Sequence, residues 1–352
     1  MNGYERIHAA IEGGDPDTTP VMLHNFLMAA HEAGVSMREY RDDPQIIARC
    51  FIESVERYGY DGIVLDVDTA TLAAAVGVPV IYPNDAPARC HGGRLSTLEA
   101  VDDLDPPDVE KHARIQIWLE AAKALSSHFR DEVYIRGNCD QAAYSLAASM
   151  RGPAEWMVEL LDSSNHERAH RLLAWCTEAV IQFIRLMSAT GVHMTSNGDS
   201  WSSPDLVSPR LYRDFALPYE RTVVDAAHAC GMPYFLHICG KTDRIVADMV
   251  STGADGLELD YKTDVQLAHD TMLGRTTFIG NLDPSGVLAA GTFEEVERKT
   301  AEVKRVFADT PRFILNAGCA IPANTPAENI RALIKIARES LLQSRCQERN
   351  HS

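Results

Sequence analysis

The chain has 352 residues, of which 45% are hydrophobic and 24% are charged, as in an ordinary globular protein. This length fits two average domains or one large α/β barrel. The formal net charge of −17 excludes the basic face that nucleic acid or an anionic membrane would need. The sequence also has no apolar run of the roughly 18 residues that a membrane span requires, and no secretory signal. We therefore expect a cytoplasmic protein without a nucleic-acid or membrane partner, in which the eight cysteines are reduced.

Eight short apolar runs alternate with segments of helical periodicity along the chain. The predicted strands are 19–26, 62–68, 133–139, 191–199, 234–240, 256–262, 276–283 and 313–319. The predicted helices are 43–58, 109–128, 155–188, 208–230, 241–251, 264–272, 293–307 and 326–343. The long stretch 71–107 predicts an extra helix and loop after the second strand. Eight strand–helix repeats indicate a parallel sheet closed into one (β/α)8 TIM barrel over 1–345, followed by a polar tail at 346–352.

Nearly every predicted strand ends in polar side chains. These residues are His24, Asn25, Asp66, Asp68, Asn138, Asp140, Asn197, Asp199, His237, Cys239, Asp260, Asn281, Asp283, Asn316 and Cys319. In a barrel these ends meet at one face, where the loops that follow the strands build the active site. Any single residue of the series has an ordinary alternative role, because polar residues at strand ends also cap the next helix. The complete series favours an active site.

Six sequence blocks stand in a recognisable order over nearly the whole chain. They are ERIHAAIEGGDPDTTPV from Glu5, DGIVLDVDT from Asp61, the stretch 137–152 ending in AASMRG, DSWSSPDLVSPRLYRDFALPYE from Asp199, GNLDP at 280–284 and NAGCAIPANTPAENI at 316–330. Together they resemble the uroporphyrinogen decarboxylase superfamily. The resemblance implies a (β/α)8 barrel of that type, with an insertion after strand 2, in agreement with the strand count made from the sequence pattern.

Two departures separate the chain from the decarboxylases of that superfamily. The decarboxylases carry arginines after the first strand that grip the substrate carboxylates, whereas the segment from Val21 to Met37 contains no arginine. Their last strand motif carries a histidine where this chain has Cys319. A substrate with eight carboxylates would need such cations in a protein of this negative charge. Both departures point away from decarboxylation of a porphyrin. A porphyrinogen decarboxylase and a non-catalytic metal- or corrinoid-binding accessory protein are kept as alternative functions.

The run HICG at 237–240, with Cys319 eighty residues beyond Cys239, looks like the H-x-C…C zinc signature of the methylcobamide-dependent methyltransferases. That branch of the superfamily includes methylcobamide:coenzyme M methyltransferases. The resemblance implies Zn²⁺ held by His237, Cys239 and Cys319, and a methyl group moved between a corrinoid carrier and a small acceptor. A thiol of the coenzyme M or homocysteine type, activated as thiolate, is the expected acceptor. Tetrahydrofolate and the demethylating direction stay open.

The residue types and spacing agree with this ligand set. His237 and Cys239 are two apart on a predicted strand, so both side chains point to one face, and Cys319 reaches the same mouth from the last strand. Soft thiolates suit zinc, and three protein ligands leave a fourth tetrahedral position open, as in catalytic sites. From the residues alone, the alternative is a core histidine with two unrelated buried cysteines. The other six cysteines are expected to be structural.

The sequence contains no D-x-H-x-x-G corrinoid-binding segment, so a methylcorrinoid co-substrate would come on a separate corrinoid protein. The resemblance leaves monomer and homodimer open. His24 and Asn25 replace the decarboxylase arginines and are candidates for acceptor binding, and His24 is also a candidate fourth zinc ligand. Asp66 and Asp68 are candidates to orient a substrate amine or a zinc-bound histidine. The remaining substrate-binding candidates are Asn138, Asp199, Trp201, Asn281 and Asp283.

Overall fold

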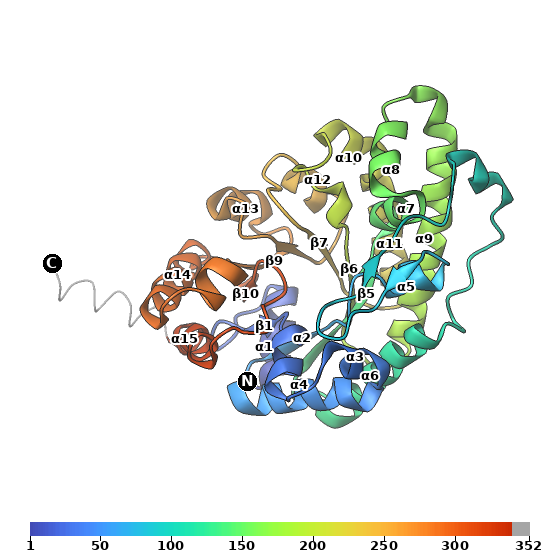
Figure 1. Ribbon diagram of the computed structural model, residues 1–352. Helices are drawn as coiled ribbons and strands as arrows, with labels where there is room; N and C mark the ends of the chain where they lie inside the picture. The colour runs from blue at the N-terminus through green and yellow to red at the C-terminus, as the bar shows by residue number, and fades with distance from the viewer. Residues whose placement is uncertain (340–352) are drawn as a thin grey trace.

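The computed structural model describes residues 1–339. Eight parallel strands form a ring that is surrounded by helices (Figure 1). The strands are β1 (Met22–Leu23), β2 (Gly62–Leu65), β5 (Tyr134–Gln141), β6 (Met194–Gly198), β7 (Tyr234–Ile238), β8 (Gly256–Leu259), β9 (Thr277–Leu282) and β10 (Phe313–Ala317). Their order in the sheet follows the chain, and a parallel bridge between Val21 and Leu315 joins the last strand to the first. The predicted (β/α)8 barrel is confirmed. The predicted tail at 346–352 lies outside the described residues, so the predicted domain boundary stays a prediction.

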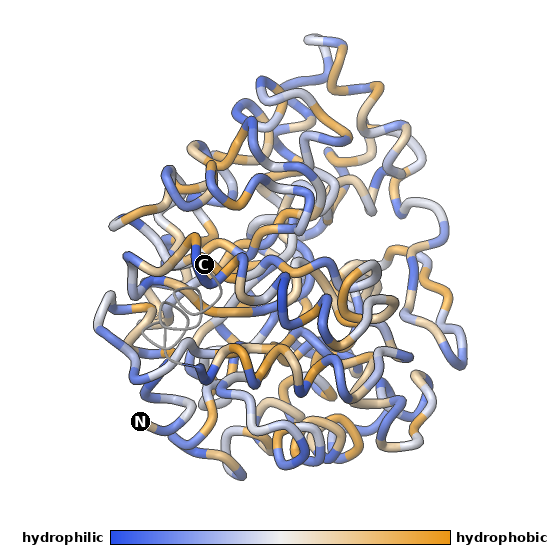
Figure 2. Tube along the Cα trace, turned by 90° about the vertical axis from the view of Figure 1, so that its left-hand side faces the viewer, coloured by the Kyte–Doolittle hydropathy of each residue, from blue (hydrophilic) through white to orange (hydrophobic). Residues whose placement is uncertain are grey.

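Helices cover the outside of the ring of strands, and α1 also covers its amino-terminal end. They are α1 (Gly3–Glu12), α2 (Phe26–Glu32), α3 (Met37–Asp42), α4 (Pro44–Tyr58), α5 (Thr71–Ala75), α6 (Ala113–Phe129), α7 (Ala143–Arg151), α8 (Pro153–Glu159), α9 (His166–Ser188), α10 (Pro209–Phe215), α11 (Leu217–Ala229), α12 (Val246–Val250), α13 (Val265–Met272), α14 (Phe293–Val306) and α15 (Ala327–Arg338). In Figure 2, hydrophobic and hydrophilic positions alternate along the peripheral helices, as expected when one helix face packs on the sheet. Every helix within residues 1–339 is too short or too polar to cross a lipid bilayer.

Two long predicted helices are each divided in the structure. The segment predicted as 155–188 forms α8 and α9. Between them lies a 3-10 turn (Ser163–Asn165), which the Asp162 carboxylate caps by accepting a hydrogen bond from the Ser164 backbone N–H at 2.9 Å. The segment predicted as 208–230 forms α10 and α11. The division falls just before Pro218, which lacks an N–H and whose ring clashes with the preceding helical turn. Prediction from periodicity alone missed both divisions.

Other differences concern helix lengths and short elements. Helix α6 begins at Ala113 rather than at residue 109, and α12 covers only the second half of the predicted 241–251. The predicted end of the last helix, 340–343, lies outside the described residues. The short helices α2, α3 and α7 were not predicted from the sequence. After β2, the predicted extra helix and loop are present as α5, an antiparallel pair of strands β3 (Val80–Ile81) and β4 (Arg89–Cys90), and a 3-10 helix (Leu98–Asp103).

The inside of the barrel is divided into an apolar floor and a polar upper layer. The floor is one cluster of buried side chains from α1 and seven strands: Ile7, Ala10, Ile11, Met22, Val64, Tyr134, Met194, Phe235, Ile279 and Ile314. Because side chains alternate along a strand, the next inward residues lie two positions later. These positions hold buried polar groups, such as Asp66 directly after β2, Ser196 on β6 and His237 on β7. The polar layer therefore faces the carboxyl ends of the strands.

Candidate metal centre

Three potential metal ligands meet at the carboxyl end of the barrel. His237 lies on β7, Cys239 follows that strand, and Cys319 follows β10. One ligand atom from each residue lies within 4.8 Å of those of the other two. His237 is buried and both cysteines are half-buried. The convergence predicted from the sequence therefore exists, although two strands separate β7 from β10 in the sheet.

The orientation of His237 leaves one ring nitrogen available for a metal. Its Nδ1 lies 2.9 Å from the backbone carbonyl oxygen of Glu258, which is the paired residue on β8. A carbonyl oxygen only accepts, so Nδ1 carries a proton and donates. Nε2 lies 3.1 Å from the Cys239 sulfur. Metal-binding histidines usually have this arrangement, with one nitrogen held by a carbonyl and the other facing the ligands.

The side chains around Cys239 favour its thiolate form. A hydrogen bond from the Cys319 thiol lowers the pKa of Cys239, and the neighbouring His237 lowers it further. The Ser200 hydroxyl, 3.4 Å from the Cys239 sulfur, adds a third polar contact. Burial disfavours the charged form of His237, but the Cys239 thiolate outweighs it and raises the pKa of His237. The Cys239 hydrogen bond and burial raise the pKa of Cys319 well above the ordinary thiol value.

The donor set fits zinc. One imidazole and two thiolates are the ligands that this ion prefers, and three protein ligands correspond to a catalytic site that has a position for substrate. His24, the predicted candidate for the fourth ligand, lies outside the group of converging donors within residues 1–339. Its Nε2 lies 2.7 Å from an oxygen of Asp66, and its Nδ1 lies 4.0 Å from Glu258 Oε1.

A buried ion pair beneath the three donors was not predicted from the sequence. Arg136 Nη2 on β5 lies 2.7 Å from Glu258 Oε2 on β8, and both side chains are fully buried. Asn316 Nδ2 donates to Glu258 Oε1 at 3.0 Å. Glu258 therefore supports His237 through its backbone and anchors the polar layer through its side chain. The sequence feature that could have predicted this ion pair is one charged residue inside each of two apolar strands, YIRG and GLEL.

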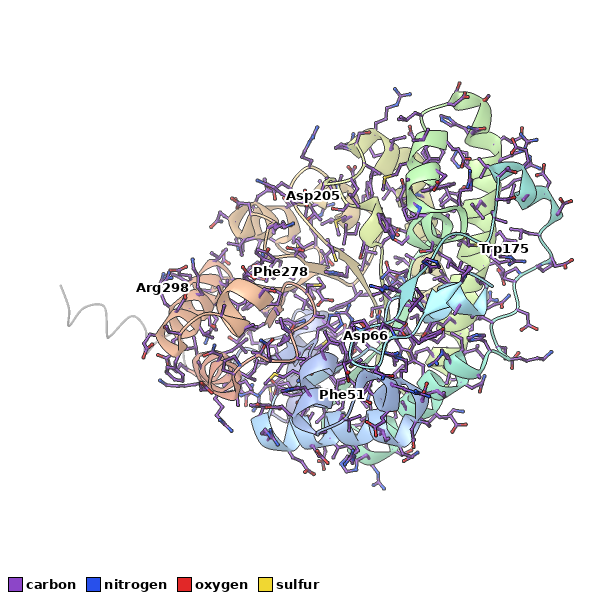
Figure 3. The ribbon with its side chains drawn as sticks, viewed as in Figure 1. Phe51, Asp66, Trp175, Asp205, Phe278 and Arg298 are labelled. Atoms are coloured by element: carbon purple, nitrogen blue, oxygen red, sulfur yellow. The ribbon has the colours of Figure 1, made fainter. Side chains whose placement is uncertain are left out.

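The predicted substrate-binding aspartates Asp66 and Asp68 lie in the segment that follows β2. Asp66 is buried and near the middle of the molecule (Figure 3), where it contacts His24. Asp68 accepts hydrogen bonds from the backbone N–H groups of Ala70 and Thr71 at 2.9 and 2.8 Å and so caps α5. Burial raises the pKa of Asp68. The geometry thus gives Asp68 the helix-capping contact that the sequence left as an alternative.

Four of the remaining predicted site residues make hydrogen bonds with other parts of the protein. Asn25 donates to Ser54 Oγ on α4 at 2.9 Å, and Asn138 accepts from Ser196 Oγ at 3.2 Å. Asp283 accepts from the backbone N–H groups of residues 285 and 286 and caps a π-helical turn, Pro284–Ala289. Asn281 donates to the carbonyl oxygens of residues 260 and 263 at 3.3 and 3.2 Å. Their predicted contact with substrate stays a prediction.

Asp199 and Trp201 lie on the loop beside Cys239. Asp199 is buried, its carboxylate accepts from the Ser145 N–H at 2.8 Å, and its own N–H donates to the His237 carbonyl at 2.7 Å. The backbone N–H of Trp201 donates to Ser145 Oγ at 3.0 Å, and the half-buried indole ring packs on the core. This loop places Ser200 against the Cys239 sulfur.

The other cysteines lie away from the three donors. Cys50, Cys139 and Cys176 are fully buried, and Cys90 and Cys230 are half-buried. All seven cysteines within residues 1–339 are free thiols, and Cys346 lies outside the described residues.

Known proteins resemble the chain over most of its length. A family model described as uroporphyrinogen decarboxylase (URO-D) matches residues 2–340. The chain belongs to the uroporphyrinogen decarboxylase family. The family resemblance predicted from the sequence blocks is thus confirmed.

Relatives of two kinds are found. The methylcobamide:CoM methyltransferase MtbA of Methanosarcina acetivorans is 31% identical over 64% of each chain. The methylcobamide:CoM methyltransferase MtaA of Methanosarcina barkeri is 27% identical over 94% of this chain and 95% of its own. A uroporphyrinogen decarboxylase of Corynebacterium diphtheriae is also 27% identical, over 86% of this chain and 87% of its own.

A solved structure described as a methyltransferase from Methanosarcina mazei superposes with a TM-score of 0.87 at 22% identity, over 96% of this chain and 98% of its own. At this identity the match shows the fold alone. Together with the family match, it confirms a (β/α)8 barrel of the uroporphyrinogen decarboxylase type.

Proposed function

We propose that this protein is a zinc-dependent methyltransferase that moves a methyl group between a corrinoid carrier protein and a small acceptor, a thiol of the coenzyme M or homocysteine type. The convergence of His237, Cys239 and Cys319 within 4.8 Å carries this proposal. Relatives named methylcobamide:CoM methyltransferases support the reaction class. Tetrahydrofolate as acceptor and transfer in the reverse direction remain variants of the proposal.

Zinc bound to these donors would hold the acceptor thiol as thiolate near neutral pH, and the thiolate is the reactive nucleophile. The residues of the chain prepare this site in three ways. The Glu258 carbonyl keeps the proton on His237 Nδ1, so that Nε2 faces the centre. The hydrogen bonds to Cys239 favour its thiolate form. Burial of His237 on β7 fixes the position of its ring.

The methyl transfer needs no oxidant, reductant or other reactant besides the acceptor and the methylcorrinoid. The thiolate sulfur forms a bond to the methyl carbon while the bond between cobalt and carbon breaks, and the electron pair stays on the corrinoid cobalt. The thiol proton leaves to solvent when the acceptor binds. Since the sequence has no D-x-H-x-x-G segment, we propose that the corrinoid comes on a separate protein that approaches the carboxyl face of the barrel.

Decarboxylation of a porphyrinogen is the second candidate, because a uroporphyrinogen decarboxylase matches with similar identity. Within residues 1–339, however, both buried arginines already have partners. Arg136 pairs with Glu258, and Arg41 on α3 donates to the carbonyl oxygens of residues 83 and 86. A polyanionic substrate would have to compete for them.

The proposal is tested by metal analysis together with methyl transfer. We expect about one equivalent of zinc per chain, lost on Cys239→Ala and on Cys319→Ala, because two ligands cannot hold the ion as three do. Cys230→Ala is the matched control, since Cys230 is half-buried but lies outside the group. Demethylation of free methylcobalamin with coenzyme M or homocysteine should fall with zinc content across the four proteins. Full zinc in both ligand variants, or release of CO2 from uroporphyrinogen, would refute the proposal. Zinc without methyl transfer to any acceptor would favour the accessory protein.

A further inference from the structure

The two cysteines of the metal centre stand on strands that do not touch. Strands β8 and β9 lie between β7 and β10 in the sheet, so no ladder of backbone hydrogen bonds fixes the distance from Cys239 to Cys319. A zinc site needs its ligands within a few tenths of an ångström of their final positions, and outer contacts usually provide this precision. The question is which residues set the spacing between the two cysteine-bearing segments.

The first contact joins the end of β8 to the segment that carries Cys239. Asp260 follows β8 and is buried, and its Oδ2 accepts a hydrogen bond from the Gly240 N–H at 2.8 Å. Gly240 is the residue directly after Cys239. The Thr263 hydroxyl adds a donor to the Gly240 carbonyl at 3.3 Å. Both polar groups of Gly240 are therefore held by the same loop.

The second contact joins the same loop to the segment that carries Cys319. Gly318 directly precedes Cys319, and its N–H donates to the Leu282 carbonyl at 2.8 Å. A Cβ atom on Gly318 would lie 2.3 Å from the backbone nitrogen of Tyr261 and 2.9 Å from the carbonyl carbon of Asp260. Such distances are too short for any side chain, and the obstacle is backbone rather than a movable side chain. Only glycine permits this approach.

The third contact fixes the loop to β9. The side-chain amide of Asn281 donates to the carbonyl oxygens of Asp260 and Thr263, and the hydroxyls of Thr242 and Thr263 lie 2.8 Å apart. Residues Asp260, Thr263, Asn281 and Gly318 thus form one connected set, which we call the β8 brace. Two residues before Asp260, the Glu258 carbonyl orients His237.

We infer that the β8 brace positions the metal ligands, with Asp260 and Gly318 setting the distance between Cys239 and Cys319. Neither residue is a ligand: both oxygens of Asp260 are occupied by backbone N–H groups, those of Gly240 and Lys262. The inference rests on the proposed zinc site. It assigns the end of β8 a role that neither the motif HICG nor the residue Cys319 reveals by itself, namely to hold all three donors from one strand.

The test measures zinc affinity by competition with a chromophoric chelator, and the absorption of the Co²⁺-substituted protein. Sulfur-to-cobalt charge-transfer bands report the thiolates, and the visible ligand-field bands report the coordination geometry. We expect Asp260→Ala and Gly318→Ala to bind zinc about 10- to 100-fold more weakly, the usual effect of losing an outer contact at a metal site. Their ligand-field bands should also shift. Asp260→Asn keeps an acceptor oxygen for Gly240 but loses the contact with the Lys262 N–H, so it should recover part of the affinity.

Two matched controls separate positioning from general damage. Asp264 also accepts a backbone hydrogen bond, from Leu267 at 2.9 Å, and stands in the same loop outside the brace. Gly14 is a glycine whose added Cβ would meet its nearest neighbour at 3.7 Å, an ordinary contact. Asp264→Ala and Gly14→Ala should keep the wild-type affinity and spectrum.

Each outcome decides a separate point. Absence of thiolate bands in the wild-type protein would refute the zinc site itself. Wild-type bands together with unchanged affinity and spectrum in Asp260→Ala and Gly318→Ala would refute the brace. If far-ultraviolet circular dichroism shows that Gly318→Ala does not fold, Asn281→Ala takes its place. That variant loses the two bonds to the loop and should likewise weaken zinc binding, whereas wild-type behaviour would count against the inference.

Discussion

The ion pair of Arg136 and Glu258 allows a quantitative test of the electrostatics inside the barrel. The side chains are 2% and 1% exposed, and Nη2 and Oε2 lie 2.7 Å apart. Glu258→Gln keeps the shape of the side chain but replaces one acceptor oxygen with a donor amide. Because Arg136 and Asn316 both donate to Glu258, one of them then faces another donor. Arg136 becomes a buried charge without a counter-charge.

The expected loss of stability follows from two lines of reasoning. Removing one partner of a buried ion pair generally costs about 3–5 kcal/mol. Burial disfavours the charged form of Glu258, but nearby positive charges, chiefly that of Arg136, outweigh this effect. The pKa of Glu258 is therefore lowered from 4.5 to about 2. That difference corresponds to about 3 kcal/mol. A lowered carboxyl pKa stabilises the fold above pH 4.5, and the contribution is lost as the pH falls toward 2. We therefore expect Glu258→Gln to lose about 3 kcal/mol at pH 7.

The assay is urea unfolding of the metal-free protein at pH 7, followed by circular dichroism. Glu302→Gln is the matched control, because the Arg298–Glu302 pair has an N–O distance of 2.6 Å but is exposed at the edge of the molecule (Figure 3). Exposed pairs contribute about 0–1 kcal/mol. The double variant Arg136→Met with Glu258→Gln should recover much of the loss, since it leaves no unpaired charge. A loss in Glu258→Gln that is no larger than that in Glu302→Gln would refute the reasoning.

Two further predictions concern the buried layer outside the barrel. Burial raises the pKa of Glu220, whose Oε2 accepts a hydrogen bond from the Tyr212 hydroxyl at 2.5 Å. When the folded state raises the pKa of a carboxyl group, the protonated group favours folding below about pH 4.5, and this contribution to stability is lost as the pH rises. Because Glu220→Gln stays neutral, its free energy of unfolding in urea should be close to that of wild type at pH 5 and higher at pH 8.5. An equal difference between variant and wild type at both pH values would contradict this reasoning. On α8, Trp156 is fully buried and Val158 is 68% exposed. Trp156→Ala should cost about 3–5 kcal/mol and Val158→Ala less than about 0.5 kcal/mol, so similar losses would show that the packing of this helix is misassigned.

The sequence by itself determined the architecture, because the information is local. All eight strands were predicted, since their apolar runs and the intervening helical periodicity follow from which faces must be buried. The spacing of His237 and Cys239 placed both side chains on one face, since a strand repeats every two residues. Boundaries were less certain where a short turn or a proline interrupts the helical periodicity, as at Ser163–Asn165 and Pro218.

Only the tertiary structure decided how the site is assembled. Closure of the sheet brings Cys319 to His237 and Cys239 across two intervening strands, and no local pattern encodes that distance. The same closure pairs Arg136 with Glu258 from strands that are not neighbours. Asp68 shows the reverse case, a polar strand end whose carboxylate caps α5. Composition and spacing identify which side chains can do chemistry, whereas the long-range packing of the barrel determines which of them meet.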